Sequence, residues 1–248
     1  EKERKIVRRF EPKFLKMCQA VITVSEGIKE DYHRMYGLKD IEVIFNAPHR
    51  KQLDSKPDHF REKLGIGKDQ VIFLYQGMMH KDRGIELLLD SAQYLQDSKA
   101  VIVFMGRGQL LEKVEEAVAT YENIFIHPMV PYEQVIEHTA SADFGLLIYE
   151  NICLNHYYCM PNKIFEYIQS DLPIMVTNLY DCKNLIEKHN IGMVIPEFTG
   201  KSFADTILRA IESDTSTFKL GLKEAAELYH WEEEEKKLIA LYKGIKEP

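Results

Sequence analysis

The sequence predicts an α/β fold with a mostly parallel sheet flanked by helices, and three observations support this prediction. Short apolar runs bounded by polar turns alternate with amphipathic helical stretches, which is the pattern of successive βα units. The chain has 248 residues, of which 45% are apolar, so it can bury one large core or two small ones. The polar segment 46–58 carries two prolines and lacks periodicity, which separates a short first part from a longer second part.

Eight apolar runs are expected to form strands. The clearest, "VIFLYQ" and "AVIVFM", are rich in β-branched and aromatic residues. Near-continuous apolar strands of this kind indicate a sheet that helices cover on both faces. In chain order, the expected strands are 20–24, 41–45, 71–76, 100–105, 123–127, 143–148, 173–177 and 192–195.

Helical patterns fill the intervals between these strands. A basic helix is also expected at the start of the chain, with Ile6, Phe10 and Phe14 on one side and Pro12 interrupting or restarting it. Such a helix either packs its apolar stripe on the protein or lies on an anionic membrane surface. The other expected helices are 26–36, 84–96, 109–120, 132–140, 162–170, 181–189, 201–212, 216–229 and 231–243.

The part before the polar segment holds one βαβ unit and a leading helix. It is too short for an independent parallel-sheet domain, because such a sheet needs several strands that are covered on both faces. It therefore either packs on the rest of the chain or ends another domain. Because the chain also begins at Glu1 without a methionine, we expect it to be part of a longer protein. The expected organisation is a first part at 1–45, a linker at 46–58 and a main domain at 59–248.

Composition excludes several classes of protein. The net charge of −7 argues against a polyanion as the main partner, so we predict no nucleic acid. The four cysteines form no CxxC pair and have no histidine at zinc-ligand spacing, which predicts free thiols in a reducing cytoplasm. The longest apolar runs are too short to cross a bilayer, and no signal-peptide layout opens the chain. We expect a cytoplasmic protein, with any membrane contact peripheral.

The segment "CMPNKIFEYIQ", 159–169, is the first candidate site. Pro161 suits the first turn of a helix because it has no N–H to leave unpaired, which puts Met160 at the cap. Methionine has no side-chain oxygen, so the free N–H groups of the first turn are available to a phosphate or a sugar hydroxyl. Glu166 falls on the same helix face as Asn162 and can accept two hydrogen bonds from a vicinal diol such as a ribose. The alternative is an uncapped, hydrated helix with Glu166 in solvent.

The segment "YQGMMHKDRGIELLLDSA", 75–92, is the second candidate. A strand ends at Gly77, a loop carries His80, Lys81 and Arg83, and an amphipathic helix starts at Gly84. Cations on a loop at the carboxyl end of a parallel strand are well placed to bind a diphosphate. The alternative is an ordinary basic surface loop.

The segment "FMGRGQLLEKV", 104–114, offers GxG after a strand. It lacks the third glycine, and the next strand ends in His127 rather than an acid, so a dinucleotide-dependent dehydrogenase is disfavoured. We expect these glycines to permit a tight turn and close helix packing. No serine lies in GxSxG and no histidines in HExxH, so hydrolase and metalloenzyme functions lack support and no metal or cofactor is predicted.

Taken in this order, the three segments resemble the donor-binding half of family 4 of the retaining nucleotide-sugar glycosyltransferases (glycosyltransferase group 1), which have the two-domain GT-B fold. The resemblance covers almost the whole chain, and the PNKxFEY helix followed by an "LP" strand is its most specific part. Residues 18–48 resemble the last βαβ unit of the family's first domain, and 228–245 resemble its closing helices. The resemblance implies a Rossmann-like donor-binding domain at 59–248, with 1–45 as a remnant of the acceptor domain.

The resemblance also implies roles for individual residues. Arg83 and Lys81 would bind the diphosphate and support the departing nucleotide as catalytic residues. Glu166 would take the ribose hydroxyls. The backbone at the start of the PNKxFEY helix would meet the diphosphate or the sugar, and the segment after the strand at 123–127 would lie near the base. The other residues implied to contact the donor are Gly77, Met129, Val130, Met160, Pro161, Asn162 and Lys163.

Two positions depart from the family pattern. Many members carry a second glutamate eight residues before the one matched by Glu166, where this chain has Tyr158. Many also carry a basic residue directly after the glycine that ends the strand, where this chain has Met78. The contact to the transferred sugar would then fall to Glu150, Asn155 or Tyr157.

The implied function is transfer of a sugar from a nucleoside-diphosphate sugar to an acceptor, with retention of anomeric configuration. The partners would be the nucleotide-sugar donor and, through the missing first domain, a sugar or lipid-linked acceptor in polysaccharide or lipid-linked glycan synthesis. Two alternatives stay open: a nucleotide-binding module without transfer activity, and a nucleotide-sugar epimerase of the same GT-B architecture.

Overall fold

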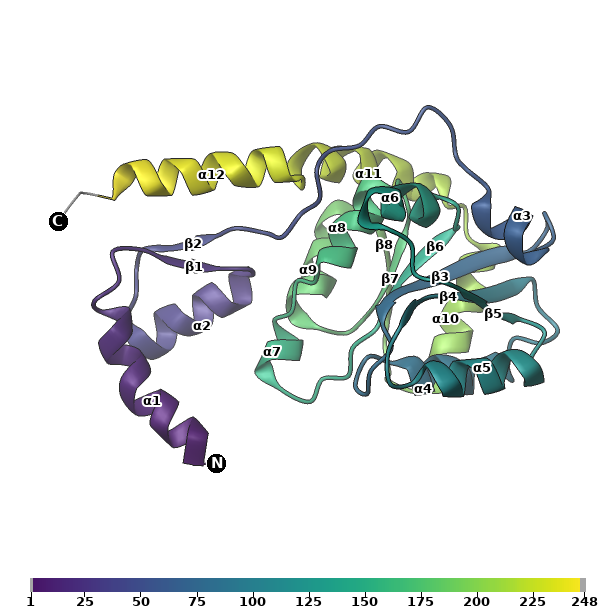
Figure 1. The fold of residues 1–248 in the computed structure, drawn as a ribbon, viewed down its shortest axis with the longest axis horizontal. Coiled ribbons are helices and arrows are strands. Elements are labelled where there is room, and N and C mark those ends of the chain that lie inside the picture. The colour runs from purple at the N-terminus through teal and green to yellow at the C-terminus, as the bar shows by residue number, and fades with distance from the viewer. Residues whose placement is uncertain (1, 246–248) are drawn as a thin grey trace.

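The computed structural model describes residues 2–245, and describes residues 2–5 and 8 by their backbone alone. The strands in this part of the chain all fall on the predicted apolar runs, and two of them continue past the predicted end (Figure 1). They are β1 (Val21–Thr23), β2 (Ile41–Val43), β3 (Val71–Met78), β4 (Ala100–Arg107), β5 (Ile124–His127), β6 (Phe144–Leu147), β7 (Ile174–Thr177) and β8 (Gly192–Ile195).

The strands form two parallel sheets. β1 and β2 make a two-stranded sheet, and the other six strands lie in the order β5-β4-β3-β6-β7-β8. The chain moves outward from β3 to β5 and then returns to β6 on the other side of β3, so the winding reverses between β3 and β6. In open sheets of this kind, ligands bind beyond the carboxyl ends of the strands at such a reversal. The predicted α/β class with a parallel sheet is confirmed.

Helices cover both faces of the six-stranded sheet. α4, α5 and α10 pack on one face, and α6, α8, α9 and α11 pack on the other (Figure 1). Two short helices, α3 and α7, are additions to the predicted set. The helices are α1 (Lys2–Leu15), α2 (Glu26–Tyr36), α3 (His59–Leu64), α4 (Ile85–Ala92), α5 (Leu111–Thr120), α6 (Tyr132–Ala140), α7 (Leu154–Tyr157), α8 (Asn162–Gln169), α9 (Tyr180–His189), α10 (Gly200–Glu212), α11 (Ser216–Leu228) and α12 (Trp231–Gly244).

The first helix runs through Pro12, so the predicted interruption is wrong. Pro12 lies near the end of α1, which stops three residues later, so the lost backbone donor weakens only the last turn. Ile6, Phe10 and Phe14 are exposed at 57%, 43% and 64%, and the apolar stripe of α1 does not pack on the described part of the chain. None of the helices among the described residues combines the length and hydropathy that a bilayer crossing requires.

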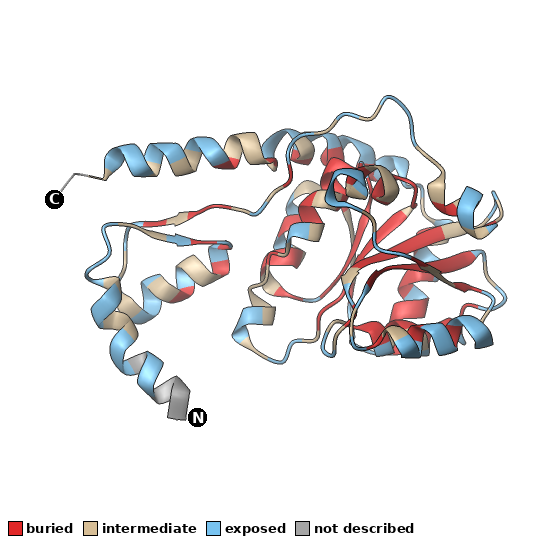
Figure 2. Ribbon diagram, in the orientation of Figure 1, coloured by how far each residue is buried: buried red, intermediate tan, exposed pale blue. Residues whose placement is uncertain are grey.

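Burial is concentrated in the larger sheet. Figure 2 shows buried residues along its strands and on the inner sides of the helices that cover it. β6 and β7 are buried along their whole length, as expected for central strands of a parallel sheet. The four cysteines are free thiols, as predicted.

The ends of β3 and β4 approach each other closely at their glycines. A Cβ at Gly106 would lie 1.9 Å from the carbonyl oxygen of Gly77. Gly108 has φ 151°, and a Cβ there would lie 2.4 Å from the carbonyl oxygen of Met79. These glycines do permit close packing. We had expected them to pack against a helix, but their neighbour is the backbone at the end of β3.

Residues 46–58 contain no helix or strand and join the two sheets alongside the start of α12. The Trp231 N–H donates to the Pro48 carbonyl at 2.8 Å, and the Phe45 N–H donates to the buried Glu234 carboxylate at 2.9 Å. Lys237 lies over the Phe45 ring, 5.4 Å from its centre. The segment that joins the two sheets is thus hydrogen-bonded to the first turns of α12.

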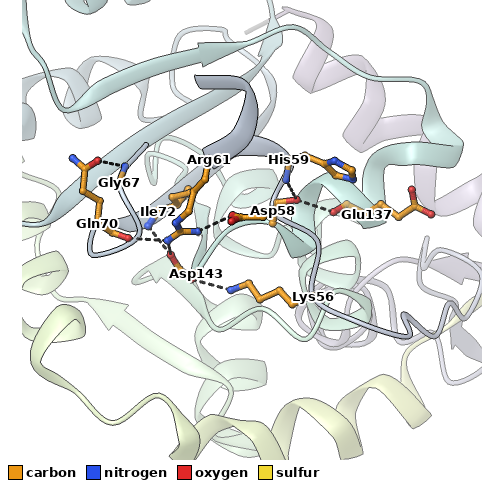
Figure 3. Close-up of polar contacts among 10 residues, drawn as sticks. Lys56, Asp58, His59, Arg61, Gly67, Gln70, Ile72, Glu137 and Asp143 are labelled. Atoms are coloured by element: carbon orange, nitrogen blue, oxygen red, sulfur yellow. Dashed lines mark hydrogen bonds and ion pairs between the residues drawn. The ribbon is translucent and has the colours of Figure 1, made fainter. Parts of the chain in front are cut away.

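A charged network fixes the end of this segment to the larger sheet (Figure 3). The Asp143 carboxylate accepts hydrogen bonds from the Arg61 guanidinium and the Lys56 ammonium, both at 2.8 Å, and from the Ile72 N–H at 2.9 Å. Burial opposes ionisation of Asp143, but these donors outweigh it and hold its pKa below the usual range. α3 is therefore anchored at the amino ends of β3 and β6, away from the edge where ligands bind.

Candidate functional site

A cavity of about 430 Å³ lies at the carboxyl ends of β3 and β4, beside the start of α8. It is the place where the reversal of strand order predicts a ligand. Its lining joins the end of β3, the segment after β5, the first turn of α6 and α8. The lining residues are Gln76, Gly77, Met78, Met105, Met129, Val130, Tyr132, Val135, Pro161, Asn162, Lys163 and Glu166.

The amino end of α8 opens onto this cavity. Pro161 is the N-cap, with extended angles of φ −76° and ψ 149°, so our assignment of Met160 to the cap and Pro161 to the first turn is wrong by one residue. No side chain caps this end, which leaves its first N–H groups available to a ligand, as predicted. The Met160 side chain is buried in the core, so only its backbone can take part in the site.

Glu166 lies one turn further along α8 and is held by the Gln76 side chain of β3, which Thr139 of α6 holds in turn. Its Oε2 accepts a hydrogen bond of 2.5 Å from Gln76 Nε2, and Gln76 Oε1 accepts one of 2.6 Å from the Thr139 hydroxyl. Thr139 fixes the orientation of the Gln76 amide, which must then present its NH₂ group to Glu166. Burial raises the pKa of Glu166, although the Gln76 hydrogen bond and the charge of Lys163 act against it. The carboxylate keeps acceptor capacity for a ligand that enters the cavity.

Two cations gather around Tyr149, just beyond β6. The Arg83 guanidinium lies 4.2 Å from the centre of the Tyr149 ring. The Lys163 ammonium lies 5.8 Å from the same ring centre and 4.3 Å from that of Tyr75. Burial and the nearby charge of Arg83 lower the pKa of Lys163 to about 7. This end of the site is suited to an anion, because both cations lack an ion pair within the described residues.

The structure brings most of the predicted donor residues together. Gly77, on β3, faces Lys163, since a Cβ there would lie 3.4 Å from Lys163 Nζ. Arg83 does not line the cavity. Its guanidinium lies over the ring of Tyr149, the ring that Lys163 also approaches. Lys81 is exposed on the loop before α4 and is outside the cavity lining. The roles of all these residues stay predictions.

The two departures from the family pattern have different surroundings. Tyr158 packs against α2, where a Cβ at Gly27 would lie 2.1 Å from its ring, and stacks edge-on to Tyr180. Met78 is 42% exposed and lines the cavity. The three residues that we expected to replace the missing glutamate, Glu150, Asn155 and Tyr157, do not line the cavity.

Sequence reasoning missed several residues of the site. Gln76 was visible as a polar residue inside an apolar strand, a pattern that marks a buried group with a specific partner. Thr139 and Tyr149 gave no such signal, because threonine and tyrosine are ordinary on a helix and after a strand. Tyr132 and Val135 were also missed, since the turn of α6 that carries them is distant from α8 in the sequence.

Comparison with known proteins agrees with this geometry. A family model described as glycosyl transferases group 1 matches residues 70–213, more than half of the chain. The chain belongs to this family. As predicted, this group 1 glycosyltransferase sequence corresponds to the carboxyl-terminal, Rossmann-like half of a GT-B protein.

Individual relatives of this group 1 glycosyltransferase are distant. TuaC of Bacillus subtilis, named as a glycosyltransferase of teichuronic acid biosynthesis, is 22% identical over 194 residues, which cover 77% of this chain and 46% of TuaC. A glycosyltransferase from Rickettsia africae has a similar structure, with a TM-score of 0.75 at 15% identity, covering 96% of this chain and 66% of that one. The structure of HepE of Anabaena in complex with UDP has a TM-score of 0.75 at 14% identity, covering 91% of this chain and 64% of HepE. The chain thus spans about half the length of TuaC and two thirds or less of these structures.

Proposed function

We propose that this chain binds the donor in a retaining group 1 glycosyltransferase that moves a sugar from a nucleoside-diphosphate sugar to an acceptor. The observation that carries the proposal is the cavity at the strand reversal, whose lining holds the fixed Glu166 carboxylate and the Lys163 ammonium, with the Arg83 guanidinium nearby on Tyr149. A nucleoside diphosphate has the matching order of groups, with a ribose diol followed by two phosphates. The UDP complex of HepE supports the same donor class.

Each end of the cavity has a distinct task in this proposal. Glu166, held by Gln76, accepts hydrogen bonds from the ribose hydroxyls, and the Met129–Val130 segment lies beside the base. Arg83 and the free N–H groups at the start of α8 face the diphosphate. When the glycosidic bond breaks, negative charge grows on the diphosphate oxygens, and fixed cations and helix N–H groups stabilise it.

The acceptor lies outside the part of the protein that this chain represents. We infer that it is a sugar or a lipid-linked sugar, and that the product is a polysaccharide or a lipid-linked glycan, as the name of TuaC suggests for that relative. The first part of the chain, 1–45, would belong to the acceptor domain, with 46–58 as the linker between the domains. Retention of anomeric configuration is part of the proposal and follows the family.

A thermal-shift panel tests donor binding directly. UDP, GDP, ADP and CMP are added with and without magnesium to the wild type, to Glu166→Ala and to Glu112→Ala, a control at an exposed glutamate of α5. At a ligand concentration about 100 times Kd, binding adds about 2.7 kcal/mol of stability and raises Tm by several degrees. We expect a rise with one diphosphate that is lost in Glu166→Ala and kept in Glu112→Ala.

Two results would contradict the proposal. An unchanged Tm with every nucleotide would contradict the assignment of this cavity as a donor site. If the rise in Tm is as large in Glu166→Ala as in the wild type, the carboxylate of Glu166 does not bind the ribose. If a nucleotide sugar is instead interconverted with another sugar without an acceptor, the epimerase alternative replaces transfer.

A further inference from the structure

Three histidine side chains from separate segments meet next to the Met129–Val130 segment of the cavity lining. His59 lies on α3, His127 ends β5 and His138 lies on α6. The His59 and His138 rings stack with their centres 4.5 Å apart, and the centres of the His127 and His138 rings are 5.3 Å apart. The Phe60 ring lies edge-on to His127 at 5.3 Å. The three histidines form a histidine stack, in which the His127 side chain is shielded from water.

Backbone contacts hold the elements that carry the stack together. The His59 N–H donates to the Ser141 hydroxyl at 3.3 Å, and this hydroxyl donates to the Glu137 carbonyl at 3.1 Å (Figure 3). α3 and α6 are therefore joined beside the stacked rings, and the charged network at Asp143 anchors α3 to the sheet as well.

The hydrogen bonds of His127 fix its tautomer. Its Nδ1 lies 2.7 Å from the Pro128 carbonyl oxygen, which can accept but not donate, so Nδ1 carries the ring proton. Nε2 then carries the lone pair. The side chain is 1% exposed, and Nε2 is buried without a hydrogen-bond partner among the described residues. A proton added to Nε2 would be a buried, charged N–H without an acceptor, which is costly.

Burial acts on the charge of His127 and of His138 in the same direction. It contributes most to the lowered pKa of both imidazoles. Against it act the hydrogen bonds that the two Nδ1 atoms donate to the Pro128 and Gln134 carbonyls, at 2.7 and 3.0 Å. The neutral form of the stack is therefore favoured in the folded protein.

The charged groups around the stack add to this effect. Lys63 and His59, both on α3, lower the pKa of His127 and of His138 further. Glu137 favours the charged form of His138, but its carboxylate is already paired with Lys51 of the connecting segment at 2.9 Å.

The stack is connected to the cavity in two ways. Pro128, whose carbonyl accepts from His127, leads directly into the Met129–Val130 segment that lines the cavity. His138 precedes Thr139, the residue whose hydroxyl orients Gln76. A change in the stack therefore reaches the lining through the backbone.

We propose that His127 positions the Met129–Val130 segment, and that acid opens this segment because His127 takes up a second ring proton only when Nε2 reaches water. This inference rests on the proposed function, in which the segment lies beside the base of the donor. The step adds one H⁺ from solvent to Nε2, and no other bond forms or breaks. His127 is a positioning residue, since it acts on the donor through the Pro128 carbonyl.

The sign of the pH dependence follows from linkage. Above the usual histidine pKa of 6.5, His127 is neutral whether the segment is closed or open, so the closed form keeps its full stability. As the pH falls below this value, the open form binds a proton that the closed form does not. The equilibrium constant for opening then increases by about tenfold per pH unit.

Amide hydrogen exchange measures opening without any nucleotide. Exchange of residues 129–134, corrected for intrinsic rates, should become at least about tenfold faster between pH 7 and pH 5 in the wild type. His127→Asn keeps an N–H for the Pro128 carbonyl and cannot titrate, so its exchange should stay nearly constant. His127→Leu removes the donor and should exchange fast at both pH values. The α10 amides, remote from the stack, serve as the internal control for global unfolding.

Nitrogen NMR of the histidine rings tests the tautomer in the wild type. Free neutral histidine prefers its proton on Nε2, whereas His127 should carry it on Nδ1 at pH 7. His127→Asn identifies the signal by its loss.

Calorimetric titration tests the effect on the donor site. UDP, GDP and ADP are titrated into the wild type and into His127→Asn at pH 7 and pH 5. The phosphates and Glu166 titrate in both proteins, so the ratio of the two Kd values isolates His127. We expect the ratio of the wild-type Kd to that of His127→Asn to be about threefold or more higher at pH 5 than at pH 7.

The outcomes separate this inference from the proposed function. Equal pH profiles of exchange in wild type and His127→Asn, or a proton on Nε2 at pH 7, overturn the acid opening. Exchange that rises equally in α10 overturns it too. An unchanged Kd ratio, with the exchange result as expected, overturns the positioning role. If none of the three diphosphates binds, the proposed function fails together with that role, and exchange and NMR still decide whether acid opens the segment.

Discussion

Gln76 shows how a single buried residue can set the chemistry of the site. Its side chain is 4% exposed and joins Thr139 to Glu166, so three elements meet in one chain of hydrogen bonds. Glu166 therefore depends on Gln76 for its position, and the ribose contact that we propose for Glu166 would depend on Gln76 as well.

Replacing Gln76 should weaken nucleoside and nucleotide binding by the same factor. Gln76→Leu leaves the Thr139 hydroxyl and Glu166 without this partner, at a cost to folding of about 1–3 kcal/mol. We expect the Kd values of the diphosphate that binds and of its nucleoside to rise together by about tenfold, because the change lies at the proposed ribose contact. Thr139→Val is the control and should have a smaller effect, since Gln76 can still donate to Glu166. A loss confined to the diphosphate in calorimetric titrations would contradict this ribose-side role.

Arg83 should show the opposite selectivity. Its guanidinium stacks on Tyr149 at the cation end of the site, so Arg83→Ala should weaken nucleoside diphosphates by about 10- to 100-fold and leave nucleosides nearly unchanged. Arg83→Lys keeps the charge but loses the planar fork, and should recover part of the affinity. Equal losses for the diphosphate that binds and for its nucleoside would contradict a phosphate role for Arg83.

Among the elements, α2 and α9 form the closest link between the first part of the chain and the main domain. The Gly27 N–H near the start of α2 donates to both oxygens of Asp181 on α9, at 3.1 and 3.2 Å. Asp181 is 5% exposed, and its burial raises its pKa to about 6, with help from Glu30 and Glu26. A carboxylate thus caps a helix from a separate part of the fold.

The contribution of Asp181 to the stability of the contact between α2 and α9 should increase as the pH falls. The pKa of Asp181 is higher in the folded protein than in the unfolded chain, so the folded state binds the proton more tightly. Its contribution is complete below about pH 4 and is lost as the pH rises through 6. Asp181→Asn keeps an acceptor for Gly27 and removes the charge, so it should be about 1 kcal/mol more stable than wild type at pH 7 and lose this advantage near pH 4.

Hydrogen exchange of the α2 amides between pH 4 and pH 7, corrected for intrinsic rates, measures this effect. Asp181→Ala, which removes the acceptor as well, should expose the start of α2 at every pH. Parallel profiles for wild type and Asp181→Asn would contradict the titration of Asp181.

The elements were largely predictable from the sequence. Apolar runs located every strand of the described chain, because a sheet covered on both faces requires continuous apolar sequence. The short helices α3 and α7 were missed, since four to six residues cannot show a helical period. The cap of α8 was misplaced by one residue because Pro161 fits both the cap and the first turn sterically.

The site was only partly predictable, for a physical reason. Motifs within one segment, such as Pro161 to Glu166, placed the residues that line the cavity from α8. Contacts between segments, such as Gln76 with Thr139, depend on the register of strands and helices that are 63 residues apart. A pattern within one segment cannot predict contacts between residues so far apart in the sequence. The family resemblance did not predict the position of Tyr149 either.

Over the whole molecule, the first part of the chain has exposed apolar surface. β1 and β2 form a sheet of only two strands, which is marginal alone, and Ile22 is 44% exposed on it. Phe14 and Met17, at the end of α1 and just after it, are 64% and 79% exposed. Exposed apolar side chains are typical of contact surfaces when they gather on one part of a molecule.

We expect this surface to drive self-association of the chain. Light scattering at increasing concentration should give a mass that rises above the monomer value of 28.9 kDa. Phe14→Glu combined with Met17→Glu should restore the monomer, whereas Leu220→Glu, at an exposed leucine of α11, should have no effect. A strict monomer for the wild type at every concentration would contradict this expectation.

The hydrogen bond between Pro48 and Trp231 has a mechanical consequence. A body held by one flexible strand can swivel freely about that strand. The connecting segment is instead hydrogen-bonded at Pro48 to the first residue of α12, Trp231, which fixes one point of it to the main domain and shortens the length that can turn freely. The Gly27 to Asp181 hydrogen bonds hold the first part of the chain at a second place, so the small sheet cannot turn away from the large one without breaking them.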